Sequence, residues 1–236
     1  MKRLVLLLLL VPSLVFAQKK ITASSWLVAD GSGNVIQSEN AYEVRSIASI
    51  SKLMTAMIVL DAHQDLDEQF KPYTRRELLQ LALVHSDNKA ANELCNNYIG
   101  GRSSCVTAMN AKARELGLAN THFTEPTGLS IMNVSTAREL VTLVQTAQKY
   151  PEIVQASQSS QVKIQIKKKW LVFNNTNPII GKRHNFIVSK TGYIKASGGC
   201  IVMMLDTDVG RRIVVVLGSK NTHTRIPEAE FIAENF

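Results

Sequence analysis

The sequence predicts an α+β fold in which strands from both ends of the chain form one antiparallel sheet, with a helical lobe inserted between them. Strand-like alternation and turn residues occur in the first and last parts of the chain, and helical periodicity fills the middle. No Pro/Ser-rich linker divides these regions. Strands grouped apart from helices are typical of the α+β class. A cleft between the sheet and the lobe is the expected place for a ligand site.

The chain opens with MKRLVLLLLLVPSLVFAQ, which has a basic start, an apolar core and a small residue at Ala17. This pattern predicts a secretory signal peptide over residues 1–17. A membrane anchor is the alternative, but Pro12 interrupts the apolar stretch, which is short of the roughly 20 residues that a bilayer requires. Residues 18–236 are then expected to be a single exported, periplasmic domain without a stable membrane anchor.

The elements of this domain follow from local patterns. Residues 22–29 and 34–38 are expected to be strands, joined by the hairpin turn Asp30-Gly31-Ser32-Gly33. Residues 49–62 are apolar nearly all round and predict a buried helix. Capping signals predict further helices at residues 75–84, 88–98, 103–116 and 136–149. Strand patterns and a terminal helix are expected at residues 162–173, 185–195, 199–207, 212–218 and 227–235.

The excess of basic over acidic residues indicates which kind of partner the chain binds. The chain has 27 Lys and Arg residues against 19 Asp and Glu, a net charge of +8, and removing Lys2 and Arg3 with the signal peptide leaves +6. In an exported protein this excess favours an anionic cell-envelope polymer over nucleic acid. The run Lys167-Lys168-Lys169 is expected to be a solvated hairpin end, because runs of like charge are usually exposed.

The three cysteines fit an oxidising compartment. Cys95 and Cys105 flank a predicted turn between two helices and could be cross-linked, although spacing alone leaves their connectivity open. Cys200 is left over in an apolar strand pattern, where a free cysteine behaves as a small hydrophobe.

A serine and a lysine three residues apart begin the segment SIASISKLMTAMIVL. The pattern is common in this chain, since Ser86-Asp-Asn-Lys89 and Ser160-Gln-Val-Lys163 share it. The second copy lies at a polar helix start, and in the third the two residues face opposite sides of a predicted strand. Only Ser49 and Lys52 share one face of an otherwise apolar helix.

Burial gives this pair a chemical meaning. Removal from water disfavours the charged form of an amine and lowers its pKa, and a nearby cation lowers it further. A neutral Lys52 can accept the hydroxyl proton of Ser49, which activates a weak nucleophile near pH 7. The alternative is that Lys52 extends along its aliphatic stem to the surface.

Two more motifs could contribute side chains to the same expected site. Ser86-Asp87-Asn88 lies between two predicted helices, where it could present a hydroxyl and an amide to the cleft. Lys190-Thr191-Gly192 occurs once, on a predicted strand with Lys190 and Gly192 on one side and Thr191 opposite. Glycine inside a strand often marks the close approach of another backbone, which suits a peptide substrate lying alongside.

Ser-x-x-Lys, Ser-x-Asn and Lys-Thr-Gly in this order resemble the penicillin-binding DD-peptidases and the serine β-lactamases. The similarity is greatest to the low-molecular-mass D-alanyl-D-alanine carboxypeptidase/endopeptidase family, and within it to the endopeptidases. The flanking segments IASISKLMTAMIVLDA, RRELLQLALVHSDNKAANEL, EPTGLSIMNVSTARELV and SKTGYIKASGGCIVM carry it. The resemblance spans residues 24–218 and implies the β-lactamase/DD-peptidase-like fold.

The resemblance also implies roles for individual residues. Ser49 would be the acylated nucleophile, Lys52 its base, and Ser86 the relay of a proton to the leaving amine. Asn88 would hold the substrate's amide. Lys190 and Thr191 would bind the substrate carboxylate, and Gly192 beside them would also belong to the substrate-binding residues. The backbone N–H groups of Ser49 and Tyr193 would form an oxyanion hole.

The partners implied by the resemblance are peptidoglycan stem peptides, with β-lactam antibiotics as covalent inhibitors. No cofactor and no metal are expected, since the five histidines show neither His-x-His nor His-Glu-x-x-His spacing. The chain departs from the family in a connection at residues 68–74 that is shorter than usual, with no hairpin expected there. A separate C-terminal β-domain of some relatives is also not expected.

Several functions therefore remain open. A D-Ala–diaminopimelate cross-link endopeptidase is favoured, with a carboxypeptidase acting on terminal D-Ala-D-Ala as the near alternative. A β-lactamase would need a water-positioning Glu-x-x-x-Asn, but Leu129 stands four residues after Glu125. A non-catalytic peptidoglycan-binding module is the remaining alternative.

Overall fold

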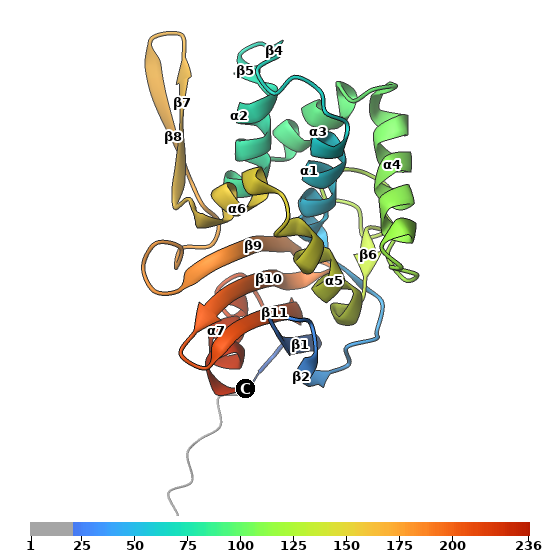
Figure 1. Ribbon diagram of the computed structural model, residues 1–236, viewed down its shortest axis with the longest axis vertical. Helices are drawn as coiled ribbons and strands as arrows, with labels where there is room; N and C mark the ends of the chain where they lie inside the picture. Colours follow the sequence, from blue (N-terminus) through green and yellow to red (C-terminus); the bar gives the residue numbers. More distant parts are fainter. Residues whose placement is uncertain (1–20) are drawn as a thin grey trace, which may run out of the picture.

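The computed structural model describes residues 21–236, so the expected signal peptide (residues 1–17) lies outside the described residues. Five antiparallel strands form the main sheet in the order β2-β1-β11-β10-β9. Their bounds are β1 Ser25–Asp30, β2 Val35–Glu39, β9 Asn185–Ile194, β10 Gly198–Thr207 and β11 Gly210–Ser219. The expected sheet built from both ends of the chain is thereby confirmed (Figure 1).

Both faces of the sheet are covered by helices. Along β1, Leu27 packs into the core that the sheet shares with the helical lobe, whereas Trp26 and Val28 pack toward α7 (Arg225–Asn235). This alternation is the period-two pattern of a strand that is buried on both sides. The helical lobe lies beyond the β9 edge of the sheet, so β9 is the edge strand that faces it (Figure 1).

The lobe consists of short helices whose ends follow the capping signals. Thr74 and Glu77 form both halves of a capping box at the start of α2, and Asp87 caps α3 by accepting from the Ala90 N–H. The helices are α1 Ser51–Asp61, α2 Arg75–Gln80, α3 Asn88–Asn96, α4 Gly101–Glu115, α5 Ala137–Ala147 and α6 Pro151–Gln158. Two turns that are not α-helical adjoin these helices. A 3-10 turn, η1 (Ala48–Ile50), precedes α1, and a π-helical turn, η2 (Leu81–His85), follows α2.

The structure corrects some of the expected elements. Residues 68–74 do contain a hairpin, made of β4 (Gln69–Phe70) and β5 (Tyr73–Thr74), so the prediction that it is lacking was wrong. Two residues per strand give no periodicity that sequence reasoning could detect. Helix α6 was not expected either, although its Pro151 occupies the first turn, where proline is well tolerated.

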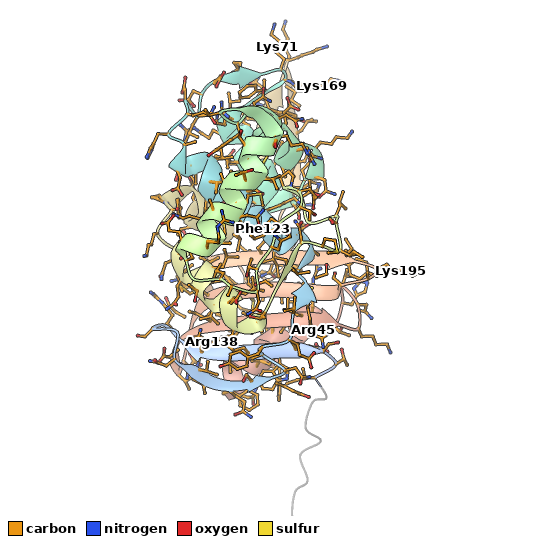
Figure 2. The ribbon with its side chains drawn as sticks, turned by 90° about the vertical axis from the view of Figure 1, so that its right-hand side faces the viewer. Arg45, Lys71, Phe123, Arg138, Lys169 and Lys195 are labelled. Atoms are coloured by element: carbon orange, nitrogen blue, oxygen red, sulfur yellow. A yellow bond between two sulfur atoms is a disulfide. The ribbon has the colours of Figure 1, made fainter. Side chains whose placement is uncertain are left out.

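The expected strand at residues 162–173 is a hairpin of two strands, β7 (Gln161–Ile166) and β8 (Lys169–Asn174). It turns at Lys167, which has a positive φ of 57°. The basic run therefore forms an exposed hairpin end, as expected. Figure 2 places both Lys169 and Lys71, of the β4–β5 turn, at the end of the molecule remote from the main sheet.

One further pairing brings a loop to the start of α1. β3 (Arg45–Ser46) pairs with β6 (Val134–Ser135), and the Ile47 N–H donates to the Asn133 carbonyl at 3.0 Å. The loop of residues 125–133 is thereby held beside Ser49. Among residues 21–236, none of the helices has the length and apolar character needed to cross a bilayer.

Candidate active site

Ser49 lies in η1, directly before α1, and Lys52 follows one turn later with its side chain fully buried. Lys52 Nζ and Ser49 Oγ are 2.8 Å apart. The i,i+3 spacing places the two side chains on one face, as the sequence predicts. The alternative, a Lys52 that reaches the surface, is excluded by its complete burial. In the other two Ser-x-x-Lys copies the lysines, Lys89 and Lys163, are exposed.

Lys52 Nζ has two further hydrogen-bond partners, Asn88 Oδ1 at 2.8 Å and the Thr127 carbonyl at 2.6 Å. A neutral amine has two N–H donors and one lone pair. If both donors go to Asn88 and Thr127, the lone pair is left facing Ser49, whose hydroxyl then donates to it. This arrangement is the one that a general base for Ser49 requires.

Burial lowers the pKa of Lys52 to about 7, since an ammonium loses its hydration in the interior, and the nearby Glu125 and Asp87 carboxylates offset part of this effect. A second buried amine, that of Lys190, lies near Lys52. Its own pKa lies well below the ordinary lysine value, because of burial first and the charges of Lys52 and Arg225 second. Burial is therefore the main reason why the amines of Lys52 and Lys190 lose their protons more easily than an exposed lysine does.

Ser86 reaches the same site from the end of η2, in a left-handed conformation with φ of 59°. Its Oγ accepts a hydrogen bond from Lys190 Nζ at 2.8 Å, and Lys190 also donates to the Thr191 carbonyl at 3.0 Å. Asn88 begins α3 two residues later and contacts Lys52. The three motifs thus converge through two lysine amines, each hydrogen-bonded to one serine hydroxyl.

The Lys190-Thr191-Gly192 segment lies on the edge strand β9 with all three residues buried, followed by the half-exposed Tyr193. A Cβ added to Gly192 would lie 3.0 Å from Ser49 N and 3.0 Å from the Ile47 carbonyl oxygen. A side chain there would be crowded, so glycine favours this approach, which brings the β9 backbone against the amide of Ser49, as the isolated glycine predicts.

Sequence reasoning missed two contacts that position this strand. Thr191 Oγ1 shares a hydrogen bond of 2.6 Å with Thr176 Oγ1, from the segment after β8. Arg225, at the start of α7, donates from Nη1 to the Gly192 carbonyl at 2.6 Å. Neither residue belongs to a short motif, and nothing in the local pattern marks them, because both contacts join segments distant in the chain.

The loop of residues 125–133 is a further part of the site whose contacts with Ser49 and Lys52 sequence reasoning did not predict. The Glu125 carboxylate accepts hydrogen bonds from the backbone N–H groups of Thr127 at 2.7 Å and Gly128 at 2.6 Å, and from the Thr127 hydroxyl at 2.6 Å. Both of its oxygens are therefore engaged within the loop. Gly128 has φ of 82°, and a Cβ there would overlap the Ala48 carbonyl. The loop thus packs against the backbone that carries Ser49 and presents the Thr127 carbonyl to Lys52.

Cys95 and Cys105 are bonded in the structure, with Cα atoms 5.4 Å apart, and they join α3 to α4 behind the site. Cys200 is a buried free thiol, as the sequence predicts.

With this geometry established, the comparison with protein families is decisive. The sequence profile described as D-alanyl-D-alanine carboxypeptidase matches residues 13–71 and 66–221, which include all three motifs. The chain belongs to the D-alanyl-D-alanine carboxypeptidase family.

Several members of the D-alanyl-D-alanine carboxypeptidase family resemble the chain over most of its length. The D-alanyl-D-alanine endopeptidases of Pseudomonas aeruginosa and Escherichia coli are each 38% identical, over 90% of this chain and 76% of their own length. A D-alanyl-D-alanine carboxypeptidase of Mycobacterium tuberculosis is 30% identical, over 83% of this chain and 74% of its own length.

Solved structures confirm the expected fold. A penicillin-binding protein from Listeria monocytogenes in its cefotaxime-bound form matches with a TM-score of 0.79 and 25% identity, over 92% of this chain and 97% of its own. A Streptomyces DD-transpeptidase has a similar fold, with a TM-score of 0.83 over 92% of this chain and 98% of its own at 23% identity.

Proposed function

We propose that this protein is a serine DD-peptidase that hydrolyses D-alanyl peptide bonds of peptidoglycan through an acyl-enzyme on Ser49. The observation that carries the proposal is the buried Lys52 amine, 2.8 Å from Ser49 Oγ and with a pKa of about 7. An amine that is neutral near pH 7 and in contact with a hydroxyl is a competent general base for it.

In the acylation step, Lys52 Nζ takes the hydroxyl proton as Ser49 Oγ attacks the carbonyl carbon of the D-Ala residue. The tetrahedral intermediate then collapses, the C–N bond breaks, and the leaving amine receives a proton. Water subsequently attacks the ester, which releases the peptide carboxylate and returns the proton to Ser49. The reaction needs no cofactor, since every proton moves between groups already in the cleft.

Ser86 is the proposed relay of the proton to the leaving amine. Its hydroxyl contacts Lys190 Nζ, and Lys52 Nζ contacts Ser49, so two hydroxyl–amine pairs stand in one cleft. Asn88 is proposed to bind the substrate's amide through its side-chain NH₂ group. Its Oδ1 accepts from Lys52, which fixes the orientation of the amide plane.

The oxyanion of the intermediate is proposed to be bound by the backbone N–H groups of Ser49 and Tyr193. The closeness of Gly192 to Ser49 N supports this, because it brings the β9 backbone next to that amide. Such a donor contributes about 3 kcal/mol to transition-state stabilisation in comparable enzymes. Lys190 and Thr191 are proposed to bind the substrate carboxylate. The excess of basic residues is consistent with an acidic polymer as substrate.

Within this reaction class, we favour cleavage of D-Ala–diaminopimelate cross-links, since two relatives at 38% identity carry the name endopeptidase. The carboxypeptidase alternative uses the same catalytic groups. Digestion of purified cross-linked muropeptides distinguishes the two: an endopeptidase converts dimers into monomers. Unchanged dimers that lose their terminal D-Ala would contradict the endopeptidase assignment.

The structure gives a reason to reject β-lactamase activity. Glu125 is the carboxylate that could position a deacylating water, but hydrogen bonds within its own loop engage both of its oxygens. The penicilloyl-enzyme is therefore expected to persist. Rapid turnover of nitrocefin by the purified protein would reverse this conclusion.

A non-catalytic binding module is distinguished by covalent labelling. Ser49 should take up fluorescent penicillin, and the Ser49→Ala variant should not. A folded wild-type protein that remains unlabelled would favour the binding-module alternative.

Residues 1–17 are proposed to direct export to the periplasm and to be removed, leaving residues 18–236 as one catalytic domain. The basic start, apolar core and Ala17 support this proposal. Mass spectrometry of the protein recovered from a periplasmic extract should give an N-terminus at Gln18. A protein that retains residues 1–17 and stays with the membrane fraction would contradict it.

A further inference from the structure

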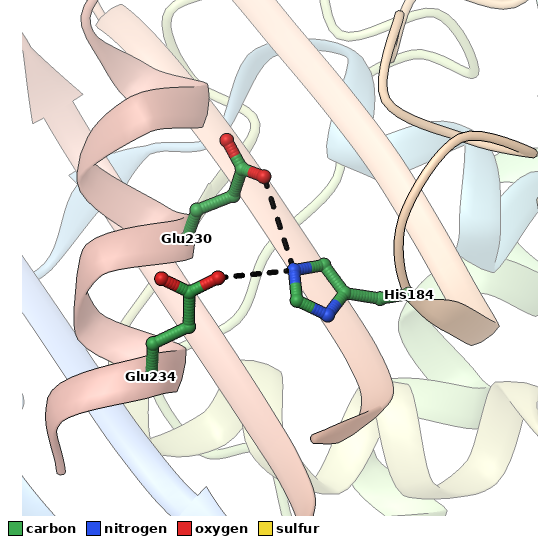
Figure 3. A group of neighbouring side chains, drawn as sticks. All are labelled: His184, Glu230 and Glu234. Atoms are coloured by element: carbon green, nitrogen blue, oxygen red, sulfur yellow. Dashed lines mark ion pairs between the residues drawn. The ribbon is translucent and has the colours of Figure 1, made fainter. Parts of the chain in front are cut away.

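A cluster of three potential metal ligands lies where the start of β9 meets the last turns of α7. His184 directly precedes β9, and Glu230 and Glu234 stand one helical turn apart on α7. His184 Nε2 lies 3.4 Å from Glu234 Oε1 and 3.8 Å from Glu230 Oε1. Figure 3 shows both carboxylates directed at this one ring nitrogen. All three ligand atoms lie within 4.8 Å of one another.

An ion pair alone accounts poorly for this arrangement. His184 Nε2 is buried and has no hydrogen-bond partner among residues 21–236, although two carboxylates face it. A protonated imidazole would be expected to donate to one of them at about 2.8 Å. The side chains of His184 and Glu230 are only 15% and 14% exposed. Two carboxylates held this close together also repel each other, and Arg183, which pairs with Glu230, is 64% exposed.

We propose that His184, Glu230 and Glu234 bind a divalent transition-metal ion, with zinc as the representative case. Zinc takes imidazole nitrogen and carboxylate oxygen at about 2.0–2.2 Å in tetrahedral geometry, so neighbouring ligand atoms lie roughly 3.4 Å apart. The distances of 3.4 and 3.8 Å match this spacing after small side-chain rotations. A neutral imidazole then supplies the lone pair, and the ion relieves the repulsion between the carboxylates.

The site has an open side. A cavity of about 470 Å³ is lined by His184 and Glu234 together with Asp206 at the end of β10 and Asp208 in the β10–β11 turn. It offers an entry path for the ion and room for a water as the fourth ligand. Sequence spacing predicted no zinc site, because His184 and α7 are distant in the chain and only the fold brings them together.

The role of the ion is structural. His184 precedes Lys190 by six residues, about 20 Å along an extended strand, so the metal takes no part in the proposed chemistry. Helix α7 already holds β9 through the hydrogen bond from Arg225 to the Gly192 carbonyl. The metal fastens the other end of the same strand to the same helix, and in this way it stabilises the strand that carries Lys190-Thr191-Gly192.

The proposal is tested on the full mature protein after treatment with EDTA and removal of the chelator. Zinc titration should give one ion per chain, and zinc at about 100 times its dissociation constant should raise Tm by about 5–10 °C. The same concentration of Mg²⁺, which prefers six oxygen ligands, should leave Tm unchanged. The His184→Ala and Glu234→Gln variants should lose stoichiometric uptake and the Tm shift, whereas His223→Ala, which replaces an exposed histidine, should keep both.

Glu234→Gln is nearly isosteric and half-exposed, so it remains folded if His184→Ala does not. Far-UV circular dichroism reports the folding of each variant without relying on the peptidase site. The proposal is overturned if the wild-type protein binds no stoichiometric zinc, if the folded Glu234→Gln variant binds it as tightly as wild type, or if Mg²⁺ produces the same shift. Each of these results leaves the proposed peptidase activity unaffected, so the two proposals fail separately.

Discussion

Lys190 Nζ donates a hydrogen bond to Ser86 Oγ at 2.8 Å, although 104 residues separate the two in the chain. Lys190 is buried on the edge strand, and Ser86 ends the π-helical turn of the lobe. The contact therefore joins the sheet to the lobe beside Ser49. It makes Ser86 the second hydroxyl of the site that is hydrogen-bonded to an amine of lowered pKa.

Loss of the Ser86 hydroxyl should slow acylation. We expect Ser86→Ala and Ser86→Gly each to lower the rate of labelling by fluorescent penicillin by about 10²-fold or more, the range for a lost proton-transfer group. Glycine accepts the left-handed conformation of residue 86 without strain, whereas alanine does not. A Ser86→Gly variant that acylates at the wild-type rate would mean that backbone strain, and not the hydroxyl, explains any loss in Ser86→Ala.

The pH dependence of acylation should report the Lys52 amine. Only neutral Lys52 accepts the Ser49 proton, and its pKa is lowered to about 7 by burial. The rate should therefore rise with pH, be half-maximal near pH 7 and reach a plateau above about pH 8. Stopped-flow acylation by a chromogenic β-lactam from pH 5.5 to 9 measures this profile. A rate that falls as pH rises through 7 would contradict the assignment of Lys52 as the base.

The same burial has a consequence for stability. The pKa of Lys52 is about 7 in the folded protein, against an ordinary value of 10.5. Between these values the unfolded chain binds a proton that the folded chain lacks, so the free energy of unfolding rises with pH, by at most about 1.4 kcal/mol per unit. Urea unfolding at pH 7.5 and 9 should show a smaller rise in Lys52→Met than in wild type. Equal rises in the two proteins would exclude the lowered pKa of Lys52 as the source.

Gly128 should be required for the position of Ser49. Its positive φ and the overlap of an added Cβ with the Ala48 carbonyl predict that Gly128→Ala destabilises the protein by more than about 2 kcal/mol and greatly reduces acylation. Gly117→Ala is the matched control, because Gly117 has a similar φ of 72° with nothing within 4 Å of the added Cβ. It should cost about 1 kcal/mol and leave acylation unchanged. Equal effects on acylation would contradict the proposed contact.

The Cys95–Cys105 bond should be detectable by counting thiols. The denatured, unreduced protein should expose a single reactive thiol, that of Cys200, and reduction should raise the count to three. Loss of a cross-link that closes a loop of this length is expected to cost about 3 kcal/mol of unfolding free energy. The Cys95→Ser/Cys105→Ser variant measures that cost in urea. Three reactive thiols before reduction would show that the bond does not form.

Much of the fold could be predicted from the sequence, because period-two and helical patterns and capping boxes are local signals. The capping box of Thr74 and Glu77 is one example. Elements of two residues per strand, such as β4 and β5, were missed because they are too short to show a period. The basic run at residues 167–169 indicated a hairpin end, but β7 and β8 were not separated within the range 162–173, since a turn at a lysine with positive φ leaves no Gly or Asn signal.

In the active site, the pairing of Ser49 with Lys52 follows from local spacing alone, because residues three apart on a helix meet wherever that helix lies. The glycine on β9 likewise indicates a close approach. The groups that make the approaches are set by the folded chain: the Thr127 carbonyl at Lys52, Ser86 at Lys190, and His184 facing two glutamates of α7. These contacts join segments far apart in the chain. The packing of side chains throughout the core brings these segments together, and no periodic pattern in the sequence predicts which segments meet.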